Sequence, residues 1–135
     1  MPIDAPDFTT WVQTIELVGT TPTPTTPSTE TLLSKLAKVT TSSTDYQTLI
    51  SYTVPAATIA ILGGIEFYAD PTSKGRFRLT VGGVEKWADQ EIPTALNHYF
   101  ADARLAAATV VLLEGKSSDG TSVDLWGSIE GKEVA

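Results

Sequence analysis

The sequence predicts an all-β fold, either a sandwich or a barrel. Short runs rich in β-branched and aromatic residues recur about every ten residues along the chain. Glycine, proline and Ser-Asp-Gly signals, which are typical of turns, separate these runs. Several runs alternate polar with apolar residues, the period of a strand in a sheet with one buried face. Strands of this length with regular turns indicate a sandwich or barrel.

Composition narrows the function classes. A chain of 135 residues is the usual size of one domain. Its net charge of -7 argues against sequence-independent nucleic-acid binding, which needs a cationic face, and against anionic membrane surfaces. The chain has no cysteine and a single histidine, so disulfides, thiolate sites and histidine-rich metal centres are excluded. We therefore expect no cofactor, no metal, no nucleic acid and no membrane partner.

The N-terminal part is predicted to be an arm on a tether. Residues 20–31 read TTPTPTTPSTET, a proline-rich and threonine-rich stretch that buries little and acts as a semi-rigid spacer. We therefore divide the chain into an arm and tether at 1–31 and a β-domain at 32–135. Apolar residues before the tether fit either helical or strand spacing, and both interpretations remain open. The arm either docks onto another protein through Trp11, Ile15 and Leu17 or folds back on its own domain.

The β-domain begins with two clear strands. Residues 46–54 are rich in β-branched and aromatic side chains and end at Pro55. Residues 58–68 form a second run, in which Gly63-Gly64 marks a bulge or bend, and Asp70-Pro71 ends it. Residues 76–81 alternate strictly and stop at Gly82-Gly83, which predicts a hairpin into a short strand at 84–88.

The C-terminal half adds further strands. Residues 109–114 form a compact apolar strand, and the turn at 117–120 leads into an alternating strand at 121–129. That alternation places Val123, Leu125, Gly127 and Ile129 on one face and Trp126 on the other. Residues 94–108 fit a helix by propensity and a strand by context. We favour a strand followed by a loop, because a lone helix would interrupt the sheet order.

Candidate catalytic groups are few. His98 would need an orienting carboxylate and a nucleophile, and Asp102 is its nearest acidic neighbour in the sequence. Asp89 and Glu91 lie near Trp87, a combination found in glycosidase clefts, but a domain this small rarely holds such a pair across a cleft. We expect these acids to be solvated loop residues and the protein not to be an enzyme.

Aromatic and basic residues are the stronger candidates for a contact surface. Six aromatic residues could form a platform for sugars, anchor an interface or pack in the core; they are Tyr46, Tyr52, Tyr68, Trp87, Tyr99 and Trp126. Trp126 shares its strand face with polar residues and is therefore expected to face away from the core. Arg76 and Arg78 form a small basic cluster with Lys74 that either is solvated or meets an acidic neighbour subunit. We select Arg78, Trp87 and Trp126 as subunit or ligand contacts.

Three segments together resemble small jelly-roll virion proteins of tailed phages and related viruses. They are TTSSTDYQTLISYTVPAATIAILGGIEFYAD, GRFRLTVGG and VVLLEGKSSDGTSVDLWGSIEGKEV. The similarity covers about 38–134 and departs from the pattern at Ala56-Ala57 and at 106–108. It implies a jelly-roll-like antiparallel β-sandwich with an extended N-terminal arm. Members of this group are head decoration, head-fibre, neck or tail-associated proteins, which commonly form trimers or rings, and the resemblance brings no catalytic residues.

These observations give two expectations for function. The first is a virion structural protein, made in the host cytoplasm, that binds a major capsid or tail protein and forms a homo-oligomer, a trimer or ring. The second is a carbohydrate-binding β-sandwich module for surface recognition, which would use the aromatic residues to bind a glycan. A small hydrolase using His98 is a third and weaker interpretation.

Overall fold

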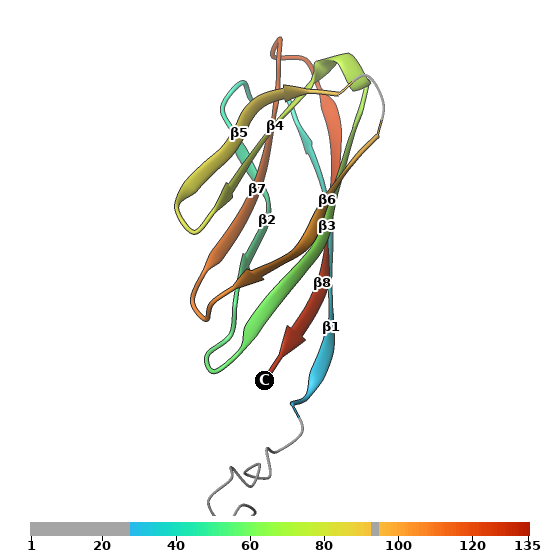
Figure 1. Ribbon diagram of the computed structural model, residues 1–135. Coiled ribbons are helices and arrows are strands. Elements are labelled where there is room, and N and C mark those ends of the chain that lie inside the picture. The colour runs from blue at the N-terminus through green and yellow to red at the C-terminus, as the bar shows by residue number, and fades with distance from the viewer. Residues whose placement is uncertain (1–27, 93–94) are drawn as a thin grey trace, which may run out of the picture.

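The computed structural model describes residues 28–92 and 95–135, in which eight strands and one short 3-10 helix occur (Figure 1). The strands are β1 (Glu30–Thr41), β2 (Gln47–Thr53), β3 (Ile59–Asp70), β4 (Gly75–Val81), β5 (Val84–Glu91), β6 (Leu96–Leu105), β7 (Val110–Ser117) and β8 (Val123–Val134). The helix η1 (Thr72–Lys74) joins β3 to β4. The all-β prediction is confirmed.

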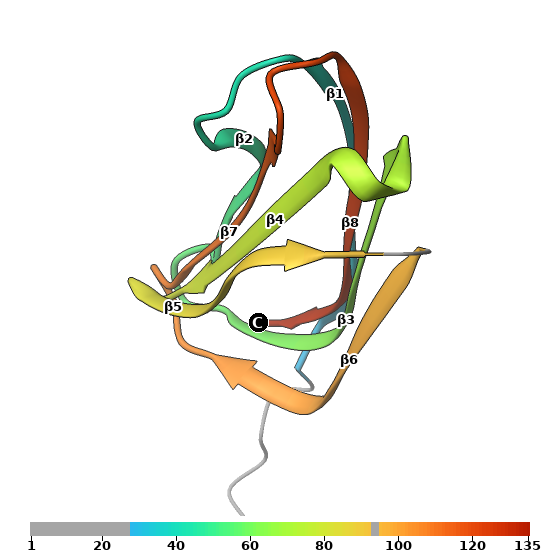
Figure 2. The ribbon, with the colours of Figure 1, turned by 90° about the horizontal axis from the view of Figure 1, so that it is seen from above.

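The strands form two four-stranded antiparallel sheets that face each other (Figure 2). One sheet has the order β1-β8-β3-β6 and the other β2-β7-β4-β5. First and last strands pair, as do second and seventh, third and sixth, and fourth and fifth. The chain therefore forms one long antiparallel ribbon of four strand pairs, which folds over so that each pair lies in the opposite sheet from the next. The topology is that of a jelly roll, and the expected β-sandwich is confirmed.

Inward-facing side chains of both sheets form one core. Its centre is aromatic, because Phe67 of β3 lies against Phe77 of β4 at a ring-centroid distance of 4.8 Å and against Trp87 of β5 at 4.9 Å. Around this centre pack aliphatic residues that are fully buried, among them Leu33, Leu62, Ile65, Leu79, Leu113, Leu125 and Ile129. The predicted inward face of the last strand is confirmed, since Val123, Leu125, Gly127 and Ile129 are all buried.

Two glycine signals act as the sequence indicated. Against β8 the register of β3 shifts by one residue between Leu62 and Gly64, so the extra residue of this bulge is Gly63. Against β6 the register shifts at the same place, but there the extra residues lie in β6, between Tyr99 and Ala103. Gly82 and Gly83 join β4 to β5 with φ values of 60° and 79°, the left-handed region that a two-residue hairpin turn of the primed kind requires. Both devices fix which side chains face the core.

Two expectations are corrected or settled by strand pairing. The sequence predicts a tether over 20–31, but β1 begins at Glu30, and Thr29 already exchanges backbone hydrogen bonds with Ala135. The domain therefore starts a few residues before Leu32. The ambiguous segment 94–108 contains strand β6, as the context argument favoured, because it pairs with β3 along most of its length.

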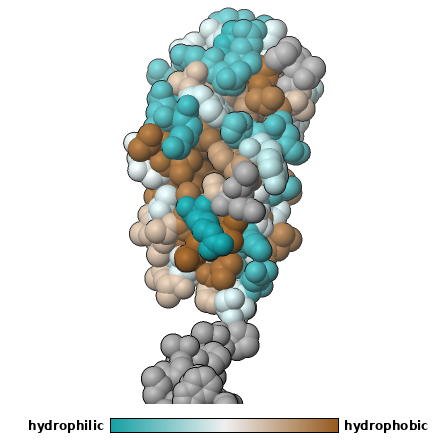
Figure 3. Space-filling model, viewed as in Figure 1, coloured by the Kyte–Doolittle hydropathy of each residue, from teal (hydrophilic) through white to brown (hydrophobic). Residues whose placement is uncertain are grey.

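The side of the sandwich bordered by β5 and β6 carries hydrophobic and hydrophilic residues interspersed (Figure 3). Within the described residues, no helix is long and apolar enough to cross a membrane. The arm residues Trp11, Ile15 and Leu17 lie outside the described residues, so their docking role stays a prediction.

Candidate functional site

The outer face of the β1-β8-β3-β6 sheet carries an aromatic row. Trp126 of β8 lies opposite Lys38 of β1 on one side and Tyr68 of β3 on the other. Because side chains alternate along a strand and Leu125 is buried, these three side chains point away from the core. The rings of Tyr68 and Trp126 have centroids 5.3 Å apart and an interplanar angle of 38°. They form a shallow, slightly curved aromatic surface.

A row of hydrogen-bonding groups runs beside the aromatic row, two residues further along β8. Ser128 lies opposite Leu36 of β1 and Glu66 of β3, and Glu66 lies opposite Asn97 of β6. The Asn97 side-chain amide donates a hydrogen bond of 3.0 Å to Glu66 Oε1. This leaves the second carboxylate oxygen, the second amide hydrogen and the amide oxygen for a ligand.

Ser128 is the unusual member of this row. Its residue is 4% exposed, and its Oγ has no hydrogen-bond partner among the described residues. A buried hydroxyl without a partner is costly and is rare in native structures. Its position at the base of the outer face makes it a group that a ligand hydroxyl would satisfy.

The two rows line one open groove of about 630 Å³. This volume is within the usual range for small-molecule sites. The lining residues come from all four strands of the sheet and from the segment before β6; they are Leu36, Ala37, Lys38, Glu66, Phe67, Tyr68, Ala95, Leu96, Asn97, Trp126, Gly127 and Ser128. The groove therefore combines an apolar aromatic floor with polar groups that converge on it.

Charges at the end of the aromatic row are already paired within the chain. Lys38 Nζ lies 4.9 Å from the centroid of the Trp126 ring and 3.7 Å from Asp124 Oδ2. Thr40 Oγ1 donates a hydrogen bond of 2.5 Å to Asp124 Oδ1. This network holds the Lys38 ammonium group over the indole ring, at the edge of the aromatic surface.

The predicted contact residues Arg78, Trp87 and Trp126 lie in three different parts of the domain. Trp126 lies on the outer face, as the alternation predicted. Trp87 is half-buried and packs against Phe67 in the core, so it belongs to the protein interior rather than to the groove. A single platform of six aromatic residues does not form, because Tyr52 is buried and donates a hydrogen bond of 2.6 Å to Glu133 Oε1. Only Tyr68 and Trp126 stand together.

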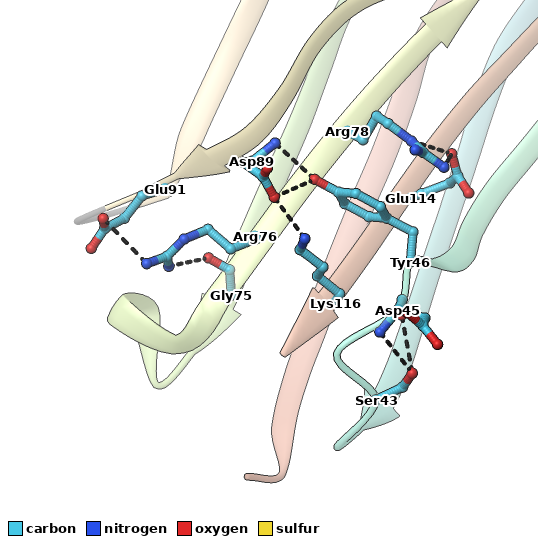
Figure 4. Close-up of polar contacts among 10 residues, drawn as sticks. All are labelled: Ser43, Asp45, Tyr46, Gly75, Arg76, Arg78, Asp89, Glu91, Glu114 and Lys116. Carbon is cyan, nitrogen blue, oxygen red and sulfur yellow. Dashed lines mark hydrogen bonds and ion pairs between the residues drawn. The ribbon is translucent and has the colours of Figure 1, made fainter. Parts of the chain in front are cut away.

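Arg78 lies on the outer face of the opposite sheet, in a cluster centred on Tyr46 (Figure 4). Its guanidinium forms an ion pair with Glu114 at 2.9 Å and lies 4.2 Å from the Tyr46 ring centroid. Lys116 Nζ lies 4.4 Å from that centroid and 2.7 Å from Asp89 Oδ1. Arg78 thus has an acidic partner within its own chain, and its role as a subunit contact stays a prediction.

Other charges in this region are satisfied in the same way. Arg76 pairs with Glu91 at 3.4 Å, and Lys74 pairs with Asp119 at 3.4 Å. Asp89 and Glu91, which could have suggested a glycosidase pair, are held by Lys116 and Arg76. These ion pairs connect separate segments of the chain.

Contacts and burial within the Tyr46 cluster shift the pKa values of three of its members. The Lys116 ammonium, followed by the Tyr46 hydroxyl, lowers the pKa of Asp89. The same contact with Asp89 raises the pKa of Lys116, and burial is the main cause of the raised pKa of Tyr46. The Tyr46 hydroxyl donates to Asp89 Oδ1 at 2.9 Å and accepts from the Asp89 backbone N–H at 2.7 Å.

Asp89→Asn is expected to lower the melting temperature more at pH 7 than at pH 3. Because folding lowers the pKa of Asp89, its charge stabilises the folded state above the usual carboxyl pKa near 4, and this is lost as the pH falls through the folded value. Asn keeps the backbone, since Asp89 has a φ of 50° and asparagine tolerates that region. Calorimetry at both pH values tests this, and an equal difference at both would contradict it.

His98 lies on β6, with its ring 4.6 Å from Phe100 in an edge-to-face arrangement. In the described part of the chain no carboxylate is hydrogen-bonded to it, and no group of three or more potential metal ligands occurs there. The side chain of Asp102 is outside what the structure describes. The hydrolase interpretation therefore stays a prediction.

Sequence reasoning missed most of the groove. Alternation in the last strand identified Trp126 and would equally place Ser128 outward. Lys38, Glu66 and Asn97 carry no signal of their own, because each becomes a groove residue only through its register with β8 or β3. The register of β1 with β8 is continuous, whereas that of β3 with β8 contains the bulge at Gly63. Which strands lie side by side is in both cases a tertiary feature.

Comparisons with known proteins add little. No family model matches the chain, and no curated protein does. Among solved structures the chain is similar to the CBM36-1 domain of a multidomain xylanase from the hindgut metagenome of Trinervitermes trinervoides, at 12% identity. The similarity covers 79% of this chain and 97% of that domain, with a TM-score of 0.40. Values this low say nothing about what the present chain binds.

Proposed function

We propose that this domain is a carbohydrate-binding module whose site is the groove on the outer face of the β1-β8-β3-β6 sheet. The observation that carries the proposal is the paired Tyr68–Trp126 surface beside an unpartnered buried hydroxyl, that of Ser128. A sugar ring has apolar C–H faces and hydroxyl groups at its edge. The aromatic row matches the first feature and the Ser128–Glu66–Asn97 row matches the second.

The charge of the groove favours a neutral glycan. Lys38 is paired with Asp124, whereas the one hydrogen bond that Glu66 makes with a side chain of the described residues comes from the neutral amide of Asn97. A uronic acid or sulfated sugar would place a second negative charge beside Glu66, where like charges repel. Carboxylate and amide groups that accept and donate hydrogen bonds suit the many hydroxyls of a neutral polysaccharide.

Glycan binding is expected to depend on both aromatic residues. Trp126→Ala and Tyr68→Ala should each weaken binding by about tenfold, and the double variant should abolish it, because each ring contributes a stacking surface. Affinity electrophoresis against neutral glucans, xylans and mannans, followed by calorimetry on soluble oligosaccharides, measures this. Ser128→Ala should weaken binding by a smaller factor, of about threefold to tenfold.

Tyr99→Ala is the matched control. Tyr99 is 75% exposed on β6 and does not line the groove, so its removal should leave affinity unchanged. Failure to bind any neutral polysaccharide at millimolar concentration would overturn the proposal. So would binding that persists in the double variant, since the glycan would then contact another surface.

A virion structural role stays a prediction. The jelly roll agrees with the fold that the sequence resemblance implied, but this fold supports many unrelated functions. A capsid or tail partner, a trimer or ring and a virion location likewise stay predictions. The two roles are compatible, because a domain on a particle surface can also bind glycans.

A further inference from the structure

We propose that two copies of this chain pair edge to edge through β1, antiparallel, with the two-fold axis at Ser34. The pairing would join two β1-β8-β3-β6 sheets into one continuous sheet. It goes beyond glycan binding and does not depend on it. The inference rests on the edge of β1, which no strand of the described residues covers, on the direction of its hydrogen-bonding groups and on the self-complementary order of its side chains.

β1 is the longest and most regular of the edge strands, although it carries two lysines, Lys35 and Lys38. It is twelve residues long and pairs with β8 in unbroken register from Glu30 to Thr41. Each of the other three edge strands carries a device that hinders pairing with another chain. β2 is shorter and has a register shift, and β5 has two shifts and a left-handed residue at Asp89. β6 has extra residues against β3 between Tyr99 and Ala103. A long, regular edge is a template for a further strand.

Hydrogen-bond parity shows which residues present their backbone to this edge. Thr29 and Ala135 exchange both backbone hydrogen bonds, at 3.1 and 3.0 Å, so they form a hydrogen-bonded pair. Such pairs alternate along an antiparallel ladder, and the register is continuous. The odd-numbered residues of β1 therefore bond to β8. The even-numbered residues, from Glu30 to Thr40, direct their N–H and C=O groups toward the free edge.

The same even-numbered residues carry their side chains on the outer face. Two of them are large apolar residues that are nevertheless exposed, Leu32 at 80% and Leu36 at 78%. Within the described residues, neither has a covering element. With a two-fold axis at Ser34, residue i of one copy lies opposite residue 68 − i of the other. Leu32 then lies opposite Leu36 of the second copy, and Glu30 lies opposite Lys38 of the second copy.

This register is the self-complementary one. It gives two leucine pairs and two opposite-charge pairs on one face, with Ser34 facing its own copy at the centre. Moving the axis to residue 35 places Leu32 opposite Lys38, and moving it to residue 33 places Glu30 opposite Leu36. Within one chain Glu30 pairs with Lys132 at 3.2 Å and Lys38 pairs with Asp124 at 3.7 Å. Both ion pairs are exposed and therefore contribute little to stability, so Glu30 and Lys38 can also pair with the second copy.

Ser34→Pro tests the edge. Proline on an edge strand is tolerated where its missing N–H would face solvent, so the fold should remain while pairing is blocked. Light scattering of the full-length chain at micromolar concentration should give twice the mass of one chain, and Ser34→Pro should give the monomer mass with an unchanged circular dichroism spectrum. A native chain that is monomeric in this experiment would overturn the proposal.

A charge swap tests the register. Lys38→Glu alone and Glu30→Lys alone should each raise the dimer dissociation constant at least tenfold, because like charges then face each other. The double variant restores opposite charges and should recover dimerisation. A mixture of the two single variants should form a heterodimer, since each supplies what the other lacks. A dimer that is indifferent to all of these changes forms through another surface and would overturn the proposed register.

A single cysteine gives an independent measurement, because the chain has none. In a hydrogen-bonded antiparallel pair the Cα atoms are about 5.5 Å apart, within disulfide range. Ser34→Cys should therefore cross-link to a covalent dimer under mild oxidation at dilute concentration. Thr40→Cys is the control on the same strand and face, since its partner in this register would be residue 28 rather than itself. Equal cross-linking of the two variants would contradict a two-fold axis at Ser34.

Discussion

Phe67→Ala is expected to lower the free energy of unfolding by about 3–5 kcal/mol. Phe67 is 2% exposed and belongs to β3, while its aromatic neighbours Phe77 and Trp87 belong to the opposite sheet. Removing its ring therefore leaves a cavity between the sheets and also removes two aromatic contacts. Because small domains are stable by only about 5–15 kcal/mol, this is a large share of the total.

Urea denaturation followed by tryptophan fluorescence measures the effect, under two-state conditions. The melting temperature should fall by about 10 °C or more. Tyr99→Ala serves as the control, because this exposed ring should change stability by only about 0.5 kcal/mol. A Phe67→Ala variant as stable as the control would mean that the sheets do not meet at Phe67.

The alternation of polar and apolar residues predicted those strands that have one clearly apolar and one clearly polar face. The last strand alternates from Val123 to Ile129, and β4 alternates before the Gly82–Gly83 turn, so both were identified with the correct inward face. β1 was not identified as a separate strand. Its leucines point both ways, with Leu33 buried and Leu32 and Leu36 exposed, so the period of two is blurred. Pairing with β8 defines this strand.

The site was harder to predict than the fold. The face of the sheet to which a side chain points follows from the local sequence of its strand, and this sufficed to place Trp126 outside the core. Proximity across strands is not local, since Tyr68 reaches Trp126 only because β3 lies beside β8 in that register. Trp87 shows the converse. Its half-buried position against Phe67 depends on the register shifts of β5, which nothing in the residues 84–88 reveals.

Gly131→Ala is the second substitution expected to have a large effect, a loss of about 2–3 kcal/mol. A Cβ at residue 131 would clash with the backbone carbonyl oxygen of Ile61 and would lie 3.1 Å from the Gly63 nitrogen. These are backbone atoms of β3, so they cannot move aside as a flexible side chain would. The bulge at Gly63 needs a neighbouring residue without a side chain, and the β8 residue that faces it is Gly131.

Gly63→Ala distinguishes this crowding from a general intolerance of alanine. A Cβ at residue 63 would meet its nearest atom, the Glu130 carbonyl oxygen, at 3.5 Å, an ordinary contact, and Gly63 is not in the left-handed region. We therefore expect a change below about 1 kcal/mol, measured by the same denaturation experiment. If Gly63→Ala were the more damaging variant, the bulge would be limited by its own backbone. The expected order instead places the constraint on β8, the strand that also carries Trp126 and Ser128, so the register that builds the groove depends on Gly131.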